Sequence, residues 1–322
     1  MQYLAPSETD TDTKRSLLRG SCLGCHSKTD GTTWQDPITM APIVYNSTEP
    51  SYNATKGLAA GNFYWVKTDD TKGHNVFLNE KDPALTAAPG KSGEENCSTK
   101  NCHKSLAEKS DAGVLAGTYG CQGCHVYPHH HADDSATVVG EAGGWYRFLA
   151  GHEPLPTYGH GVEGIEDKDW QYTYNASDHN EYLGDGSVSK ITQVSLTNHT
   201  MTAFCCGCHR NFHIQDNTVS GQSPWFRHPS DALIPNSGEY ASAFGASGGT
   251  GTYDPLVPVA RPSLSGWTGP SGTVTLGTDL VTCLSCHRAH ASPYCKMMRW
   301  DYKGWPGNGQ TNGCNVCHTS KN

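Results

Sequence analysis

Paired cysteines followed directly by a histidine recur along this chain, and their spacing is suited to holding haem. In a Cys-x-x-Cys-His sequence the two thiols can add to the two vinyl groups of one haem, and the histidine can then bind its iron from one face. Five motifs have this form, and a sixth has four residues between its cysteines. The cysteine pairs are Cys22 and Cys25, Cys97 and Cys102 (the longer motif), Cys121 and Cys124, Cys205 and Cys208, Cys283 and Cys286, and Cys314 and Cys317. The pattern predicts six covalently attached haem c groups.

The residue after each second cysteine is the predicted first, or proximal, ligand of the iron. These residues are His26, His103, His125, His209, His287 and His318. Zinc ribbons and thioredoxin-like redox pairs also use Cys-x-x-Cys sequences. A zinc ribbon, however, pairs two such units about 15 to 20 residues apart and gives no reason for a histidine after every second cysteine. The recurrent histidine therefore favours a hexahaem cytochrome c.

The chain has more than enough further histidines to supply a second, or distal, ligand to every iron. Of its 17 histidines, 11 remain after the proximal ones, and methionine, the usual alternative, occurs only five times. The remaining histidines are His74, His129, His130, His131, His152, His160, His179, His199, His213, His228 and His290. Ligation by two histidines leaves no open position on the iron and gives lower potentials than His/Met ligation. We therefore expect six bis-histidine haems.

Some of these histidines follow a motif too closely to bind the haem of that motif. His290 lies three residues after His287, and His213 lies four after His209. Three residues span only about 10 Å when fully extended, which is too short to pass the porphyrin edge with ease. Both are predicted to bind a neighbouring haem and to hold two haems close together. The cluster at 129–131 invites the same interpretation, whereas an isolated histidine elsewhere in the long gaps is more typical of the surface or a haem edge.

Two cysteines lie outside the motif pairs. Cys206 stands inside the fourth motif, where the spacing from Cys206 to Cys208 is too short for haem, so Cys205 is the better partner of Cys208. The other is Cys295. In an oxidising compartment an even remainder predicts a disulfide between Cys206 and Cys295. The alternative is two free thiols.

The aliphatic content is too low for an ordinary core of this size. Leu, Ile, Val and Phe make up 48 of 322 residues, or 15% of the chain. Chains below about 20% in these residues are often disordered, and six covalently held haems would supply the missing apolar surface. We expect one haem-packed domain over 1–322. Its predicted fold is mostly irregular coil, with a few short helices and minor strands wrapped around a continuous haem stack.

Local patterns place only short elements along the chain. We expect a helix over Thr13–Arg19, a helical turn at each Cys-His motif, and short strands over 145–149 and 273–276. The segment 237–251, rich in Gly and Ser, is predicted to be loop.

The charge and the lack of long apolar runs bear on location and partners. The formal net charge is -8, and haem carboxylates add to it, which argues against a nucleic-acid partner or an anionic membrane. No apolar run reaches the 18 or so residues of a membrane-spanning helix. Haem c is attached outside the cytoplasm, yet the sequence shows no secretory signal. We expect an exported protein, extracellular or at the cell surface, whose signal peptide has been removed.

Several short sequences resemble the extracellular cytochrome nanowires of metal-respiring microbes, the OmcS and OmcE type. They are Phe63–Lys67, Lys72–Asn75, Leu85–Gly90, Phe226–Pro229 and, most specifically, Cys283–Ser292. The resemblance spans roughly residues 60 to 318. It implies subunits that polymerise head to tail, an unbroken haem chain along the filament, and at least one haem completed by a histidine of the adjacent subunit.

The same resemblance implies identities for the distal ligands. By motif, these are His74, His129, His213, His228 and His290, and His152, His160 and His199 compete for the sixth place. His130, beside His129, stays a further candidate from the histidine cluster. The chain departs from the family in two respects: no motif precedes Cys22, and the longer Cys97/Cys102 motif is additional.

The function that these features favour is electron conduction along a polymeric cytochrome filament to an external acceptor. Its partners are then other copies of the chain, redox proteins and extracellular acceptors. The first alternative is a soluble periplasmic multihaem electron carrier, which needs no polymer. A multihaem oxidoreductase is the second alternative, but it needs an open iron position, often signalled by Cys-x-x-Cys-Lys, and that sequence does not occur. We therefore expect an electron-transfer protein rather than an enzyme.

Overall fold

The computed structural model describes rather more than half of the chain, mainly its C-terminal half. The described residues are 26–29, 33–38, 40–48, 56–62, 64, 136–141, 143–149, 161–187, 195, 197–206, 228–289, 291–294, 297–303, 305–307 and 309–321.

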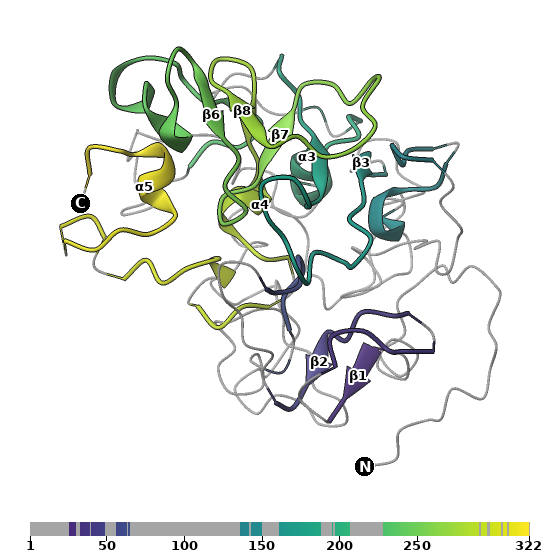
Figure 1. The fold of residues 1–322 in the computed structure, drawn as a ribbon. Coiled ribbons are helices and arrows are strands. Elements are labelled where there is room, and N and C mark those ends of the chain that lie inside the picture. The colour runs from purple at the N-terminus through teal and green to yellow at the C-terminus, as the bar shows by residue number, and fades with distance from the viewer. Residues whose placement is uncertain are drawn as a thin grey trace, which may run out of the picture.

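Helices and strands in this part of the chain are short and are joined by turns and coil (Figure 1). The α-helices are α3 (Met201–Cys206), α4 (Cys283–Cys286) and α5 (Cys314–Cys317), and the 3-10 helices are η3 (Tyr146–Phe148), η4 (Gly238–Tyr240) and η5 (Ala243–Gly245). The strands are β1 (Ser27–Lys28), β2 (Tyr45–Asn46), β3 (Gly164–Ile165), β4 (Glu181–Leu183), β5 (Ala232–Leu233), β6 (Thr250–Thr252), β7 (Val259–Arg261), β8 (Thr273–Thr275) and β9 (Leu280–Val281). In the described residues no helix is long and apolar enough to span a membrane.

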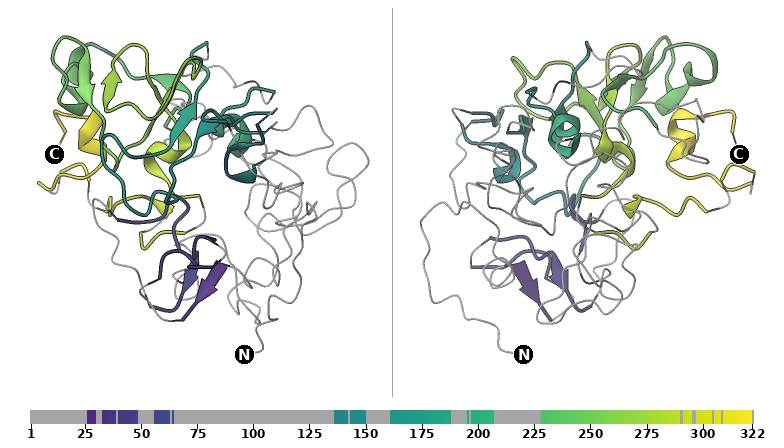
Figure 2. Two further views of the ribbon diagram at one scale, coloured as in Figure 1. Left: turned by 45° about the vertical axis from the view of Figure 1, so that its right-hand side comes forward. Right: turned by 180° about the vertical axis from the view of Figure 1, so that it is seen from behind.

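The largest sheet has five strands in the order β3-β4-β7-β9-β5. Its β4 and β7 run parallel, and the other neighbours are antiparallel. A separate antiparallel pair joins β6 to β8, and β1 pairs with β2 in parallel. Figures 1 and 2 show β1 and β2 at one end of the molecule, away from both other sheets. The helices α3 and α4 contact one another, and Met201 and Leu284 pack with Tyr182 of the large sheet. The large sheet thus supports two of the helices that carry motif cysteines.

Two apolar clusters surround the sheets. One joins nine buried residues, among them Phe244, Tyr253 and Trp300, and Cys286, Cys314 and Cys317 pack against it. The other centres on Tyr146 and Tyr182. The expected wrapping of coil around haem is therefore accompanied by a core of ordinary side chains. Its members come mainly from the long interval between the fourth and fifth motifs, whose few aliphatic residues are gathered into strands.

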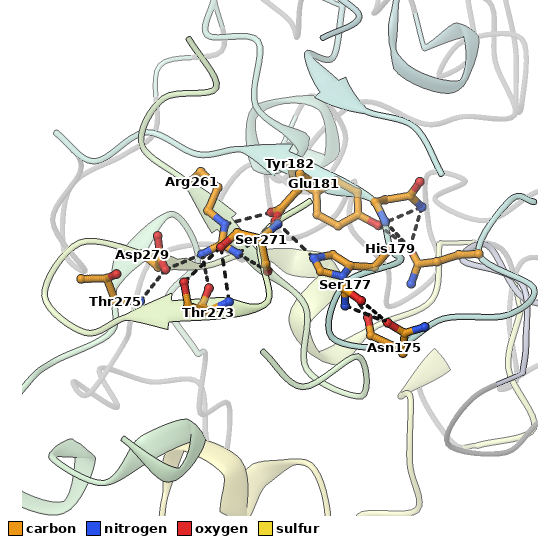
Figure 3. Close-up of polar contacts among 12 residues, drawn as sticks. Asn175, Ser177, His179, Glu181, Tyr182, Arg261, Ser271, Thr273, Thr275 and Asp279 are labelled. Atoms are coloured by element: carbon orange, nitrogen blue, oxygen red, sulfur yellow. Dashed lines mark hydrogen bonds and ion pairs between the residues drawn. The ribbon is translucent and has the colours of Figure 1, made fainter. Parts of the chain in front are cut away.

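A buried ion network crosses the large sheet (Figure 3). Arg261 on β7 donates from Nε to Glu181 Oε2 on β4 at 2.9 Å and from Nη1 to Asp279 Oδ2 at 2.5 Å. All three side chains are buried. Desolvation by itself raises the pKa of Glu181, but hydrogen bonds from His179 and Arg261 outweigh it, so the net pKa is lowered. The network keeps a buried charge paired on both sides, which is the condition under which buried charges are tolerated.

The predicted elements can be compared with the structure where it describes them. The strand expected at 273–276 is confirmed as β8, and the helical turns expected at the fifth and sixth motifs are confirmed as α4 and α5. At the fourth motif, α3 includes Cys205, and the remaining motif residues lie outside the described residues. The strand expected at 145–149 is wrong, because Arg147 and Phe148 have φ values of 48° and 63° and turn the chain into η3. The predicted loop at 237–251 contains the turns η4 and η5 and the start of β6. The helix expected over Thr13–Arg19 lies outside the described residues.

An N-terminal segment contacts the chain directly after the fifth motif. Ala291 donates from its backbone N–H to the carbonyl of Ala60 at 3.1 Å, and Arg288 donates to the carbonyl of Leu58. Gly61 has φ +75°, and a Cβ there would lie 1.4 Å from the Ala291 carbonyl oxygen. Only glycine fits at this crossing of two backbones.

Candidate haem-binding site

The fifth and sixth motifs have the same local geometry. In α4 and α5 the two cysteines occupy the first and last helical positions, so they lie three residues apart on one face of the turn. The backbone N–H of the following histidine caps each turn: His287 donates to Cys283 O at 3.1 Å, and His318 donates to Cys314 O at 2.8 Å. Both thiols and the histidine of a motif are therefore presented by one rigid turn, as attachment to a single haem requires.

Residues around α4 fix its start and its exit. Thr282 and Ser285 form a capping box, in which the Thr282 N–H donates to Ser285 Oγ at 3.0 Å. After the helix the chain pairs with 297–299, where Arg299 N–H donates to Cys286 O at 2.8 Å and His287 bridges Met298. His287 is therefore anchored in a hairpin-like strand rather than in a free loop.

Around α5 the anchors are amide side chains and tryptophan rings. Asn312 Oδ1 accepts the N–H of Cys314 at 2.9 Å, and Asn315 Oδ1 accepts the indole N–H of Trp305 at 3.1 Å. A Cβ on Gly313 would lie 2.3 Å from the Trp300 ring. The glycine before the sixth motif is thus required by the close packing of Trp300 on the start of α5.

The fourth motif contributes Cys205, which lies beside the fifth motif. Thr200 caps α3 by accepting the N–H of Ala203 at 2.9 Å, and Cys205 stands in the last turn of that helix. A hydrogen bond with Cys205 is the largest effect that lowers the pKa of the Cys283 thiol. The first cysteines of the fourth and fifth motifs are therefore neighbours across the contact between α3 and α4.

The fifth and sixth motifs are also neighbours. Burial raises the pKa of Cys286 to about 12, and the nearby Cys314 and Cys317 thiols add to that rise. Burial likewise raises the pKa of Cys317 to about 12. The three C-terminal motifs thus form one contiguous group, although the sequence separates the fourth from the fifth by a long interval.

His228 and His318 lie close together, at a separation that two ligands of one iron would have. Their ring centroids are 6.2 Å apart and their planes meet at 85°. Two imidazoles bound to opposite faces of one iron place their ring centres about 6 Å apart, since each metal–nitrogen bond is about 2 Å long and each centre lies about 1 Å beyond its nitrogen. The separation of this pair fits a haem iron between the rings.

The other ring nitrogens of this pair are already engaged. His228 Nδ1 lies 2.8 Å from the carbonyl oxygen of Pro229, and His318 Nδ1 lies 3.4 Å from Glu239 Oε1. Metal-binding histidines commonly donate one N–H to a carbonyl or carboxylate and coordinate through the other nitrogen. In each ring, Nε2 is therefore the nitrogen that would bind an iron.

Electrostatics keep His228 neutral and Glu239 charged. His228 has exposed surface, yet protein surrounds its ring on most sides, and this desolvation, with His318 and His287 nearby, lowers its pKa. At Glu239 a desolvation effect that raises the pKa is outweighed by hydrogen bonds from Lys321 and His318, so the pKa is lowered. A neutral imidazole is the form that binds a metal.

The other described histidines separate into two kinds. His26 Nδ1 lies 2.7 Å from Pro42 O, and His199 Nδ1 lies 3.0 Å from Gly161 O, so in both rings Nδ1 contacts a backbone carbonyl, as is common in metal-binding histidines. His179 differs, because Nδ1 lies 3.0 Å from Asn175 O and Nε2 lies 3.2 Å from Glu181 Oε1, and its ring stacks on Tyr253 at 3.5 Å. Both nitrogens of His179 are used, so it is a structural residue of the ion network.

Sequence reasoning missed a buried arginine next to the fifth motif. Arg299 is 4% exposed, its Nε donates to Leu284 O at 2.6 Å, and its buried Nη2 has no hydrogen-bond partner among the described residues. Desolvation, followed by the like charge of Arg288, lowers the pKa of Arg299. A buried cation without an anion is costly, so this site fits a carboxylate of the haem held by the motif next to it. Its position before Trp300 gave no signal in the sequence.

Many predicted site residues lie outside the described residues. They are Cys22, Cys25, Cys97, Cys102, His103, Cys121, Cys124, His125, Cys208, His209, Cys295 and the distal candidates His74, His129, His130, His152, His160, His213 and His290. The buried Cys206 is described, but its predicted disulfide partner is not, so that pairing stays a prediction. The proposed binding of His290 and His213 to neighbouring haems also stays a prediction.

Comparisons with known proteins identify the C-terminal motifs and a similar cytochrome. A family model described as a doubled CXXCH motif matches residues 277–322. The chain is 24% identical to the C-type cytochrome OmcS of Geobacter sulfurreducens, over 88% of this chain and 72% of that protein.

Solved structures similar to this chain come from the same organism. The outer membrane cytochrome S filament has a TM-score of 0.52 and 18% identity, covering 91% of this chain and 76% of that one. A structure of the OmcS nanowires has a TM-score of 0.46 and 21% identity, covering 86% and 73%. The predicted resemblance to OmcS-type cytochromes is confirmed, and the chain has a multihaem cytochrome fold with haem c as its cofactor.

Proposed function

Because the chain has the fold of the OmcS-type multihaem cytochromes, we propose that it is a subunit of an extracellular filament that conducts electrons. In this proposal electrons hop between six haem c groups within one haem-packed domain and pass to an external acceptor. The relatives named as a filament and as nanowires support polymerisation. The protein then acts as an electron carrier rather than as an enzyme.

The observation that carries the proposal is the pairing of His228 with His318. His318 ends the last motif and His228 lies 90 residues earlier, yet their ring centroids are 6.2 Å apart and Nδ1 of each lies near a protein oxygen. Two histidines on one iron leave it no open position, so such a haem exchanges electrons and binds no substrate. That is the property required of a conductor.

Residues of this chain have distinct tasks at the proposed haem pair. Cys283, Cys286, Cys314 and Cys317 would hold the two macrocycles covalently, and His287 and His318 would bind their irons. When bound, each haem supplies a reversible one-electron change at its iron. Arg299 would neutralise a haem carboxylate inside the protein, and the apolar cluster around Trp300 would keep water away from this end of the chain.

Contacts between the three C-terminal motifs support a continuous path. Cys205 lies beside Cys283, and Cys286 lies beside Cys314 and Cys317. Successive haems attached to these pairs would be neighbours. At a filament joint, a histidine from the next copy would complete a terminal haem and give a directional contact that propagates without closing.

Two measurements on the purified, haem-loaded protein test the proposal. Intact-mass spectrometry should show six haem additions, including one at the Cys97/Cys102 motif, and negative-stain microscopy at neutral pH should show filaments. Five additions would remove the longer motif from the assignment. A fully loaded protein that stays monomeric at high concentration would contradict the filament and favour the soluble periplasmic carrier.

A further inference from the structure

We infer that Glu239 is a positioning residue for electron transfer, which sets the orientation and the reduction potential of the haem bound by His318 through the Nδ1 atom of that histidine. The inference rests on the proposed role of His318 as an iron ligand. It goes further by assigning a task to a residue that lies far from every Cys-His motif in the sequence.

Glu239 lies in η4 and is tied to the segment after α5 by four contacts. Its Oε1 is 3.4 Å from His318 Nδ1 and 3.3 Å from Lys321 Nζ. Ser320 Oγ donates to Oε2 at 3.2 Å, and Thr319 Oγ1 donates to the backbone carbonyl of Glu239 at 2.6 Å. One acidic residue thus binds four consecutive residues that begin with the proposed ligand.

Aromatic rings hold the imidazole from the sides. The Tyr240 ring centroid lies 5.3 Å from that of His318, and the Trp305 centroid lies 5.9 Å away. With the ring confined in this way, the hydrogen bond to Glu239 selects which nitrogen of His318 carries the proton.

The partner of His318 differs in charge from the partners of other ligand candidates. Nδ1 of His26 and of His228 faces a backbone carbonyl, which is neutral, whereas Nδ1 of His318 faces a carboxylate. A carboxylate that accepts a hydrogen bond from Nδ1–H makes the ring a stronger electron donor to the metal. This stabilises the oxidised, more positive iron more than the reduced iron, so Glu239 is expected to lower the reduction potential of the haem bound by His318.

Lys321 provides a second charge of opposite sign at the same place. Its Nζ contacts the same oxygen, Oε1, that faces His318. Removing the lysine charge should leave a more negative carboxylate on the ligand and lower the potential further. Glu239 and Lys321 variants are therefore expected to move one haem in opposite directions, which a purely structural role would not do.

The test is a spectroelectrochemical titration of the haem-loaded protein that resolves its individual haems. Glu239→Gln should raise the reduction potential of one haem by about 59 mV, which corresponds to about a tenfold change in its one-electron reduction equilibrium. Lys321→Gln should lower the same component by a smaller amount. Glu141→Gln, which removes an exposed acidic charge elsewhere, is the matched control and should leave all components in place.

Different failures have different meanings in this experiment. Unchanged potentials in Glu239→Gln, or shifts of the same sign in both variants, overturn the inference and leave the proposed function intact. A wild-type mass that lacks the haem at Cys314 and Cys317 overturns the haem assignment itself. If Glu239→Gln loses haem on purification, Lys321→Gln still decides the sign, because it leaves Glu239 in place.

Discussion

The large sheet and the region around the Cys-His motifs both contain arginine and histidine side chains, but the hydrogen-bond partners of these side chains differ. In the sheet, Arg261 is paired with two carboxylates, and both nitrogens of His179 have protein partners. Beside the motifs, the buried Nη2 of Arg299 has no hydrogen-bond partner among the described residues, and His228 contacts the carbonyl oxygen of Pro229 through Nδ1. A haem carboxylate and a haem iron would complete these two side chains.

The largest effect is the loss of stability expected when the buried ion network of the sheet is broken. Arg261→Met would leave Glu181 and Asp279 buried without their cation, and breaking a buried ion pair in this way costs about 3–5 kcal/mol. Urea unfolding of the haem-loaded protein, followed by circular dichroism, should show this loss. Arg147→Met, at a partly buried arginine that lies outside this network, is the control. Equal stability of Arg261→Met and wild type would mean that the network does not stabilise the sheet.

Asp231 lies where the two regions meet, and its ionisation should set a pH dependence. It is fully buried, and burial raises its pKa from 3.8 to about 6, against the effect of a hydrogen bond from Thr200. Since the folded-state pKa lies above the unfolded one, the folded chain binds this proton more tightly. The contribution to stability is therefore lost as pH rises from about 4 to about 6.

Replacing the Asp231 carboxyl by an amide should remove this loss of stability with rising pH. Asp231→Asn is expected to be more stable than wild type near neutral pH by about 3 kcal/mol, and to match it near pH 4 or fall below it. Unfolding by urea across this pH range measures the difference between the two proteins. A difference that stays constant with pH would show that Asp231 does not titrate as described.

A smaller effect is expected from replacing Arg299, whose buried Nη2 has no hydrogen-bond partner among the described residues. Arg299→Gln removes a positive charge beside the fifth motif, so the reduction potential of one haem should fall. The expected shift is about 59 mV, which corresponds to about a tenfold change in the one-electron reduction equilibrium. The same titration on Arg147→Gln should show no shift, because that arginine is already paired with Glu166. Identical potentials in the Arg299 variant and wild type would place the haem carboxylates elsewhere.

The sequence predicted the chemistry of the site better than its supporting structure. Covalent attachment depends on spacing within five or six residues, so the turn that presents Cys314, Cys317 and His318 can be predicted locally. The resemblance of Phe226–Pro229 to a known family pointed to His228 as a distal ligand, but its pairing with His318 depends on the fold and was not predicted. Composition alone also hid the sheet, because a few aliphatic residues concentrated in β4, β7 and β9 are enough to build it.

Roles that depend on a distant partner could not be predicted from the sequence. Nothing local distinguishes His179, whose two nitrogens bind Asn175 and Glu181, from a ligand histidine. The strand predicted at 145–149 failed for a similar reason, since its aromatic and aliphatic residues satisfy strand propensity while the backbone turns at Arg147.

The central claim, that His228 completes the haem attached at Cys314 and Cys317, is tested most directly by the spin state of the haems. His228→Ala should convert one haem of the loaded protein to a five-coordinate, high-spin form that binds carbon monoxide when reduced, and the others should stay low-spin. His179→Ala is the matched control and should leave every haem low-spin, whatever it costs in stability. A His228→Ala protein with all haems low-spin and unreactive to carbon monoxide would contradict the claim.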